Sequence, residues 1–293
     1  MAGCMKRLLL ASLALCFAAS TAAAATLDTI TQRGSIRIGY VAGQSPFSAG
    51  KPGADPEGYA IDLCDRIADD VEHHVPELTR DYIEVTLADG FEAVKAGKID
   101  LLCGAITVNL DRREIVDFSQ PIFVTGATAL LRTDSPAYLR PLFIETPAAR
   151  TVSADAASTS TIGVRANTTT RATLHEAQAF QGSSMKIADF ATHDDGLAAL
   201  ENRGIDAYFA DRALLVELAK RARDPSSLEV GDRLFTHEPY AVALPRNDSD
   251  FRLLADRALT NFFRSDDFMP TLTAYFGAEA PMLYTQIMME HIP

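Results

Sequence analysis

Long apolar runs are scarce in this chain. Residues 8–17 (LLLASLALCF) form one, with Lys6 and Arg7 before it and small residues at 22–25 after it. The run is too short to span a membrane, which takes about 20 apolar residues, and no later segment approaches that length. This order of basic, apolar and small residues predicts a secretory signal peptide over residues 1–25, and therefore a mature protein outside the cytoplasm.

Cysteine is also scarce, with four residues in the whole chain. Cys16 in the apolar run could carry a lipid anchor, but Leu15 stands before it where that modification needs a small residue. Removal of the leader would leave Cys64 and Cys103. In an oxidising compartment these two are either bridged or are two separate buried thiols, and their spacing alone does not decide between the two.

Basic residues are outnumbered, with 27 Lys and Arg against 39 Asp and Glu and a formal net charge of −12. Loss of Lys6 and Arg7 with the leader changes that charge to −14. A surface this acidic argues against nucleic acid and anionic lipid as partners. The mature chain of about 268 residues is long enough for one large domain or for two lobes with separate cores.

Short β-rich segments alternate with helical patterns from one end of the chain to the other. In the first half, strands are expected at 35–41, 83–86 and 99–103, and helices at 61–72 and 91–96. An apolar run at 122–131 has the character of one long strand. In the second half, strands are expected at 162–165, 185–190, 206–210 and 240–244, with helices from 169, over 194–202, around 214–219 and over 251–262. This rhythm predicts an α/β fold with mostly parallel, helix-covered sheets.

The rhythm is interrupted once. Residues 133–160 are rich in Pro, Ala, Ser and Thr without a clear period, which is typical of a loop or an insertion. The restart beyond them suggests two lobes. In open α/β sheets, ligands bind beyond the carboxyl ends of the strands, so the loops after Val41, Cys103, Arg165 and Ala210 are expected to face one another.

Several segments, in order and at consistent spacing, resemble those of one protein family. They are GKIDLLCGAITVNLDRREIVDFSQPIF at 97–123, LDTITQRGSIRIGY at 27–40 with Pro-Phe at 46–47, GYAIDL at 58–63, and DAYFAD at 206–211. On these motifs, residues 27–276 are similar to the polar amino-acid-binding proteins of bacterial ABC importers, solute-binding protein family 3. The Cys103–Gly104 pair, the NLDR spacing and His193 resemble the glutamate/aspartate-binding branch. Relatives in this branch often carry both Cys64 and Cys103, which favours a disulfide between them.

The resemblance implies a two-lobed, periplasmic-binding-protein-like type II fold, in which two mostly parallel sheets are joined by two crossing segments. The crossing segments are expected at about 123–131 and 236–243. The implied division of the mature chain is a first part of lobe one (26–122), lobe two with the crossing segments (123–239), and a return to lobe one with C-terminal helices (240–293). The resemblance further implies a periplasmic home and a membrane permease as partner for a protein that binds a small amino acid. A monomer without a cofactor or a metal is also expected.

The resemblance also implies how an amino acid is held. A free amino acid presents a carboxylate and an ammonium group, which need a forked cation and an anion as partners. Arg112 of the family signature fits the carboxylate, and Thr107 adds a hydroxyl and a backbone N–H group. Thr168 and Thr169 stand at a helix start, where N–H groups can point at an anion. Asp211 fits the ammonium group.

These residues have structural alternatives. An arginine near the start of a short helix is often a solvated surface charge. Asp211 could be a helix N-cap, and Thr168 or Thr169 could be simple caps. The family motifs favour ligand contact, and for Asp211 the two roles are compatible.

The pocket for the ligand's side chain is expected to be largely apolar. Its walls are expected to be Val41, Gln44, Leu87 and His193. Ala105, where relatives commonly have a serine, is also expected to contact the ligand. The acidic-substrate branch places arginines where this chain aligns Val41 and Gly90, and one histidine does not replace two arginines unless it is protonated. Because burying an unpaired carboxylate costs several kcal/mol, a neutral side chain, glutamine-like or medium-sized apolar, is expected rather than an acidic one.

Two other functions remain open. The same fold has a dehydratase offshoot that acts on prephenate-like acids, and such chemistry needs a general acid beside the substrate. The aligned positions offer only His193 and Asp211, and the ammonium group already engages Asp211. A receptor that serves a membrane sensor would use the same binding chemistry as one that serves an importer. A binding protein that is not an enzyme is therefore expected.

Overall fold

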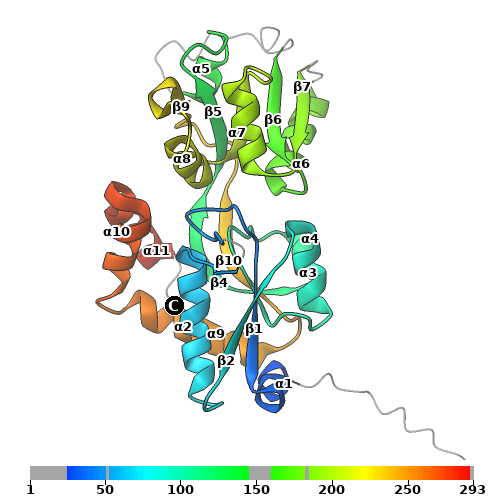
Figure 1. Ribbon diagram of the computed structural model, residues 1–293, viewed down its shortest axis with the longest axis vertical. Helices are drawn as coiled ribbons and strands as arrows, with labels where there is room; N and C mark the ends of the chain where they lie inside the picture. Colours follow the sequence, from blue (N-terminus) through cyan, green and yellow to red (C-terminus); the bar gives the residue numbers. More distant parts are fainter. Residues whose placement is uncertain (1–24, 51–52, 145–159, 182–184, 291–293) are drawn as a thin grey trace, which may run out of the picture.

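The computed structural model describes residues 25–50, 53–144, 160–181 and 185–290, which form two lobes, each built on one sheet (Figure 1). The expected signal peptide lies outside the described residues except for its last position. Most of the expected loop at 133–160 lies outside them as well. Its described first part contains a one-turn helix, α5 (Arg140–Phe143).

The first sheet has five strands in the order β2-β1-β3-β10-β4. They are β1 (Ser35–Tyr40), β2 (Thr79–Glu84), β3 (Leu101–Cys103), β4 (Asp117–Thr125) and β10 (Glu238–Leu244). β1 is parallel to β2 and β3, whereas β10 is antiparallel to both β3 and β4, so β10 alone runs against the rest. One face is covered by α1 (Thr26–Arg33), α2 (Tyr59–Glu72) and α9 (Ser249–Phe263), and the other by α3 (Leu87–Lys95).

The second sheet repeats this arrangement, with the strand order β7-β6-β8-β5-β9. Its strands are β5 (Ala127–Arg132), β6 (Thr161–Arg165), β7 (Lys186–Phe190), β8 (Ala207–Asp211) and β9 (Leu228–Val230). Here β5 is the reversed strand, because it is antiparallel to both β8 and β9 while β6 is parallel to β7 and β8. Helices α7 (His193–Glu201) and α8 (Arg212–Lys220) cover one face, and α6 (Thr169–Gln181) and α5 the other; a short 3₁₀ helix (Pro225–Ser227) precedes β9.

The chain crosses between the sheets twice. Gly126 separates β4 from β5, and residues 231–237 lead from β9 back to β10. The prediction of one long strand over 122–131 is therefore wrong, because the run contributes to two strands in different sheets. A Cβ atom at Gly126 would lie 2.3 Å from the carbonyl oxygen of Thr236, so only glycine lets the two crossings run this close together. The expected lobe boundaries near 122 and 239 fall inside β4 and β10.

Helix α2 is tied covalently to the first sheet. Its predicted apolar face is buried throughout: Ile61, Cys64, Ile67, Ala68 and Val71. Cys64 on that face forms a disulfide with Cys103 at the end of β3, with the two Cα atoms 6.5 Å apart. The disulfide that the resemblance favours is thus confirmed, and it anchors the strand end from which the pocket loop continues.

The C-terminal part forms α10 (Phe268–Phe276), a 3₁₀ turn (Gly277–Glu279) and α11 (Ala280–Glu290), which lie beside the first lobe (Figure 1). Ala280, Leu283 and Ile287 of α11 are buried in the same apolar cluster as α2 and α9. Within the described ranges, no helix combines the length and the apolar character that a membrane crossing needs.

Candidate functional site

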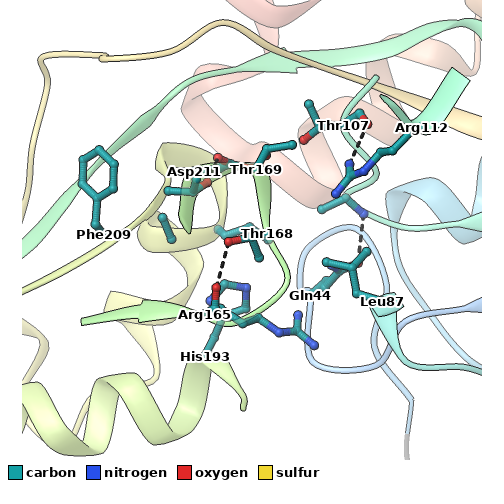
Figure 2. A pocket seen from close by; sticks show the side chains of 14 residues that line it. Gln44, Leu87, Thr107, Arg112, Arg165, Thr168, Thr169, His193, Phe209 and Asp211 are labelled. Atoms are coloured by element: carbon teal, nitrogen blue, oxygen red, sulfur yellow. Dashed lines mark hydrogen bonds between the residues drawn. The ribbon is translucent and has the colours of Figure 1, made fainter. Parts of the chain in front are cut away.

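A pocket lies between the two lobes, lined by residues of both (Figure 2). From the first lobe it is lined by Gln44, Leu87, Ala105, Thr107 and Arg112. From the second lobe it is lined by Arg165, Thr168, Thr169, Thr170, His193, Phe209, Ala210, Asp211 and Leu214. Nine of the ten residues that the sequence selects as ligand contacts are therefore brought together on one surface.

Val41 is the exception. Its side chain is fully buried and packs with Leu87 and Phe91 in the apolar cluster beneath α3. The alternation along β1 explains this placement, because the preceding residue, Tyr40, packs in the cluster on the opposite face of the sheet. The expectation that Val41 lines the pocket is corrected accordingly.

Arg112 lies in the one-turn helix α4 (Leu110–Arg113), which begins after Asn109. The Asn109 side chain accepts a hydrogen bond from the backbone N–H of Arg112 at 2.8 Å, which fixes the turn. The guanidinium group donates to the carbonyl oxygen of Thr107 at 2.6 Å and lies 4.8 Å from the centre of the Phe91 ring. These contacts hold Arg112 at the pocket wall, so it is not a freely solvated surface charge.

Asp211 ends β8 and directly precedes α8, yet its side chain does not cap that helix. Its two carboxylate oxygens instead accept hydrogen bonds from the hydroxyl of Thr170, at 3.1 Å, and from the hydroxyl of Tyr240. The side chain is buried, and burial raises its pKa from 3.8 to about 6, with the charge of Glu238 adding to the rise. The N-cap alternative for this carboxylate therefore does not hold.

Arg112 and Asp211 approach the pocket from opposite lobes (Figure 2). Burial lowers the pKa of Arg112, while the charges of Glu238 and Asp211 act against that change. Among the described residues, neither side chain has an ion-pair partner within 4.0 Å. A cation and an anion thus face the same cavity without neutralising each other.

Thr168 and Thr169 stand at the start of α6, and each hydroxyl already has a partner. The Thr168 hydroxyl donates to the carbonyl oxygen of Arg165 at 2.8 Å and accepts from the N–H of Arg171 at 3.1 Å. The Thr169 hydroxyl donates to the carboxylate of Glu238 at 3.0 Å. Thr168 is therefore a helix cap, as one alternative held, and what the two residues still offer the pocket is the backbone N–H groups of the helix start.

Gln44 and Ala105 join two loops of the first lobe. The side-chain oxygen of Gln44 accepts a hydrogen bond from the N–H of Ala105 at 3.0 Å, and the Ser48 hydroxyl lies 3.4 Å from the same oxygen. Gly104 has φ +151°, and a Cβ there would lie 2.6 Å from that oxygen, so glycine is required for this approach. With the oxygen engaged, Gln44 faces its remaining surroundings as a hydrogen-bond donor.

His193 is the first residue of α7 and is buried. Its Nδ1 atom lies 3.0 Å from the hydroxyl of Tyr208, within hydrogen-bonding distance. Burial, helped by the charges of Arg165 and Arg221, lowers the pKa of His193 to about 3. At neutral pH His193 is therefore uncharged, and it brings no positive charge to the pocket.

Arg165 lines the pocket although the sequence does not select it as a ligand contact. The sequence marks it only as the last residue of the strand expected at 162–165, even though the end of a parallel strand is where ligand contacts are expected. In Figure 2 its side chain extends from the end of β6 towards the side of the pocket that holds Gln44 and Leu87. Phe209, Ala210, Thr170 and Leu214 also line the pocket without having been expected there.

Comparisons with known proteins agree with this architecture. The family model for "Bacterial extracellular solute-binding proteins, family 3" matches residues 36–278. The glutamate/aspartate import solute-binding protein of Salmonella typhimurium is 28% identical over 237 residues, which cover 80% of this chain and 74% of that protein. The L-glutamate/L-aspartate-binding protein of Pseudomonas aeruginosa is 27% identical over 259 residues, covering 87% and 81%.

Among solved structures, an ancestral amino acid-binding protein described as a precursor of cyclohexadienyl dehydratase superposes with a TM-score of 0.71. The match covers 86% of this chain and 100% of that one at 22% sequence identity, so it speaks for the fold alone. The two-lobed architecture is that of type II periplasmic binding proteins, as expected from the sequence. Since the family model spans most of the chain, this protein belongs to the bacterial extracellular solute-binding proteins, family 3.

Proposed function

We propose that this protein is a periplasmic receptor that captures a small amino acid between its lobes and delivers it to the membrane permease of an ABC importer. The observation that carries the proposal is the pair of unneutralised opposite charges, Arg112 and Asp211, on opposite sides of one pocket. Membership of the family supports it, as do the functions of the two relatives named above, which bind glutamate and aspartate.

The charges match the two ends of a free amino acid. The guanidinium of Arg112 binds the α-carboxylate, helped by the N–H of Thr107 and the N–H groups at the start of α6. The carboxylate of Asp211 binds the α-ammonium group, beside the hydroxyls of Thr170 and Tyr240 that already orient it. Both charged groups of the ligand are then paired with protein groups, which replace the water that hydrates them in solution.

Capture works by closure of the lobes. We take 26–122 with 240–293 as lobe one and 123–239 as lobe two. A ligand that touches Arg112 in one lobe and Asp211 in the other gains both contacts only when the lobes are together, so it shifts the equilibrium towards the closed form. The crossings at Gly126 and at 231–237 are the segments that must bend. The closed surface is what a permease can recognise, and the receptor acts as a monomer.

The same pocket offers little to a dehydratase. Its titratable groups other than arginine are Asp211 and His193. The first has a pKa of about 6 and the second a pKa of about 3, so at neutral pH Asp211 is mostly ionised, His193 is uncharged, and neither carries an acidic proton for a general acid to donate. Binding without catalysis is therefore the function that this chemistry supports.

Calorimetric titration with the twenty common amino acids tests the proposal. At least one should bind with a dissociation constant in the micromolar range or below. Arg112→Ala should weaken that binding by about 2 kcal/mol or more, because a buried carboxylate loses its partner. Arg113→Ala is the matched control, since Arg113 is the exposed neighbour outside the pocket, and it should bind as the unchanged protein does. Equal affinity of the Arg112 variant would refute the assignment.

A further inference from the structure

The pocket leaves one of its two arginines without a carboxylate: the charges of Glu238 and Asp211 act on Arg112, whereas no described carboxylate acts on Arg165. Its lining contains two arginines, Arg112 and Arg165, but one carboxylate, Asp211, and a neutral His193. A zwitterion bound at its two ends neutralises Arg112 and Asp211. Arg165 would then remain as an unmatched cation in a closed site, which is costly.

Arg165 lies at the far end of the pocket from the pair that would hold the zwitterion. Figure 2 shows Arg165 and His193 at one end and Thr107, Arg112 and Asp211 at the other, with Thr168 between. This is the end where the side chain of a bound amino acid would lie. Gln44 lines the same end, and its side-chain oxygen is already engaged by the N–H of Ala105.

The guanidinium of Arg165 is not paired by the protein. Its Nη1 atom is buried without a hydrogen-bond partner, and its Nε–H donates to the carbonyl oxygen of Ala191 at 3.3 Å. No described carboxylate forms an ion pair with it, although other arginines of the same lobe, such as Arg171 with Asp189 at 2.7 Å, are paired. Burial lowers the pKa of Arg165, and of the surrounding groups only the hydroxyl of Tyr208 acts against that change.

A buried arginine nitrogen in a ligand pocket that lacks a hydrogen-bond partner can donate to an acceptor on the ligand. A carboxylate at the distal end of the ligand would accept from Nη1 and cancel the extra charge, with the Gln44 amide as a second donor. An amide side chain would satisfy the hydrogen bond but leave the charge, and an apolar side chain would satisfy neither.

We propose that Arg165 is the specificity-determining residue of this receptor, and that it selects amino acids with an acidic side chain by pairing with their distal carboxylate. The proposal rests on the amino-acid-binding function above and names the ligand class for it. It reverses the expectation of a neutral side chain, which counted no arginine at this end of the pocket.

Titration calorimetry at pH 7.0 with L-glutamate, L-aspartate, L-glutamine and L-asparagine tests the inference. Each acid and its amide are nearly equal in shape, so the comparison isolates the charge. The unchanged protein should bind at least one acid 10-fold or more tightly than its amide. Arg165→Gln should weaken binding of that acid at least 30-fold and change binding of the amide less than 3-fold, so that the preference disappears.

Two controls separate selectivity from folding. Arg171→Gln removes a guanidinium of the same lobe that lies outside the pocket, and it should leave both affinities within 3-fold. The melting temperature of ligand-free Arg165→Gln should equal or exceed that of the unchanged protein, because the replaced charge has no described ion pair to lose and its hydrogen bond to the carbonyl oxygen of Ala191 is long, at 3.3 Å. A lower melting temperature would indicate a structural role and would count against the inference.

The remaining outcomes are distinguishable. If the protein binds an amide, a basic or an apolar amino acid as tightly as the acids, the inference is wrong while the proposed function stands. The inference is also wrong if Arg165→Gln keeps the preference for the acid. If no amino acid binds the unchanged protein, the proposed function fails and the inference fails with it.

Discussion

Asp211→Asn is expected to stabilise the ligand-free protein while it removes amino acid binding. Burial and, after it, the charge of Glu238 raise the pKa of Asp211. The hydroxyls of Tyr240 and Thr170 and the charge of Arg112 oppose this only in part, and the resulting pKa is about 6. At neutral pH the folded state therefore carries an ionised carboxylate in a place that disfavours it. Removing that charge should favour folding, and it also removes the partner of the ammonium group.

The magnitude follows from the shift between 3.8 and about 6. One pKa unit corresponds to roughly 1.4 kcal/mol, so the destabilisation at pH 7 is about 3 kcal/mol. Because the folded-state pKa lies above the unfolded-state pKa, the cost in stability is absent below pH 3.8. It grows as the pH rises from 3.8 to about 6 and is complete above about 6. Asparagine can accept only one of the two hydroxyl hydrogen bonds, which costs about 1 kcal/mol. The net gain in unfolding free energy is therefore about 2 kcal/mol at pH 7 and near zero at pH 4.

Urea unfolding of the ligand-free protein at pH 7.0 and pH 4.0, followed by circular dichroism, measures both values. Asp189→Asn is the control of opposite sign, because the hydrogen-bonded Arg171 holds the pKa of Asp189 below its ordinary value, and its replacement should not stabilise the protein. An Asp211→Asn variant that is less stable than the unchanged protein at pH 7.0, or equally stabilised at both pH values, would refute the reasoning.

Three further predictions concern binding and the fold. Amino acid affinity should be constant above about pH 7 and fall about tenfold per unit below pH 6 as Asp211 takes up a proton, and calorimetry giving equal affinity at pH 5 and pH 7 would contradict its role. Replacing Cys64 and Cys103 together by alanine opens a loop with a sequence separation of 39 and should lower the unfolding free energy by about 2–4 kcal/mol. The amino acid affinity should stay within threefold of that of the unchanged protein. An unchanged urea midpoint would show that the disulfide contributes nothing to stability. Small-angle scattering should show a smaller radius of gyration with ligand than without, and Arg112→Ala should not compact at the same ligand concentration; compaction of that variant would argue against closure on Arg112.

Periodicity located most of the elements because each lobe buries its apolar residues in a simple pattern. The face of α2 with Ile61, Cys64 and Ile67 packs as its spacing predicts. The error at 122–131 has a physical cause: β4 and β5 are both apolar, and the break between them at Gly126 is set by contact with Thr236, more than a hundred residues away. No local pattern carries that information.

The two charged residues on opposite sides of the pocket, Arg112 and Asp211, could be selected from the sequence because each lies in a motif at a strand or helix end. The family motifs indicated Arg112 and Asp211, and the restart at 162–165 located the helix start with Thr168. Two features could not be predicted in this way. The side of the sheet that Val41 faces depends on where β1 ends. The orientation of Arg165 depends on the positions of the surrounding groups, none of which offers it a carboxylate. Both are set by tertiary packing rather than by spacing.

The free-energy cost of burying unpaired charges in the pocket explains how closure can depend on the ligand. Salt bridges elsewhere in the protein pair their charges, as Arg33 does with Asp100 and Arg80 with Asp69. In the pocket, by contrast, burial lowers the pKa values of Arg112 and Arg165 and raises that of Asp211, so each charge is disfavoured where it stands. Closing the lobes without a ligand would desolvate these groups further and gain no partner. A ligand that brings the complementary charges makes the electrostatic free energy of closure favourable. It does so only in the closed form, since the groups belong to both lobes. The same unpaired charges that make the empty site unfavourable therefore supply the difference in free energy that a ligand-gated receptor needs.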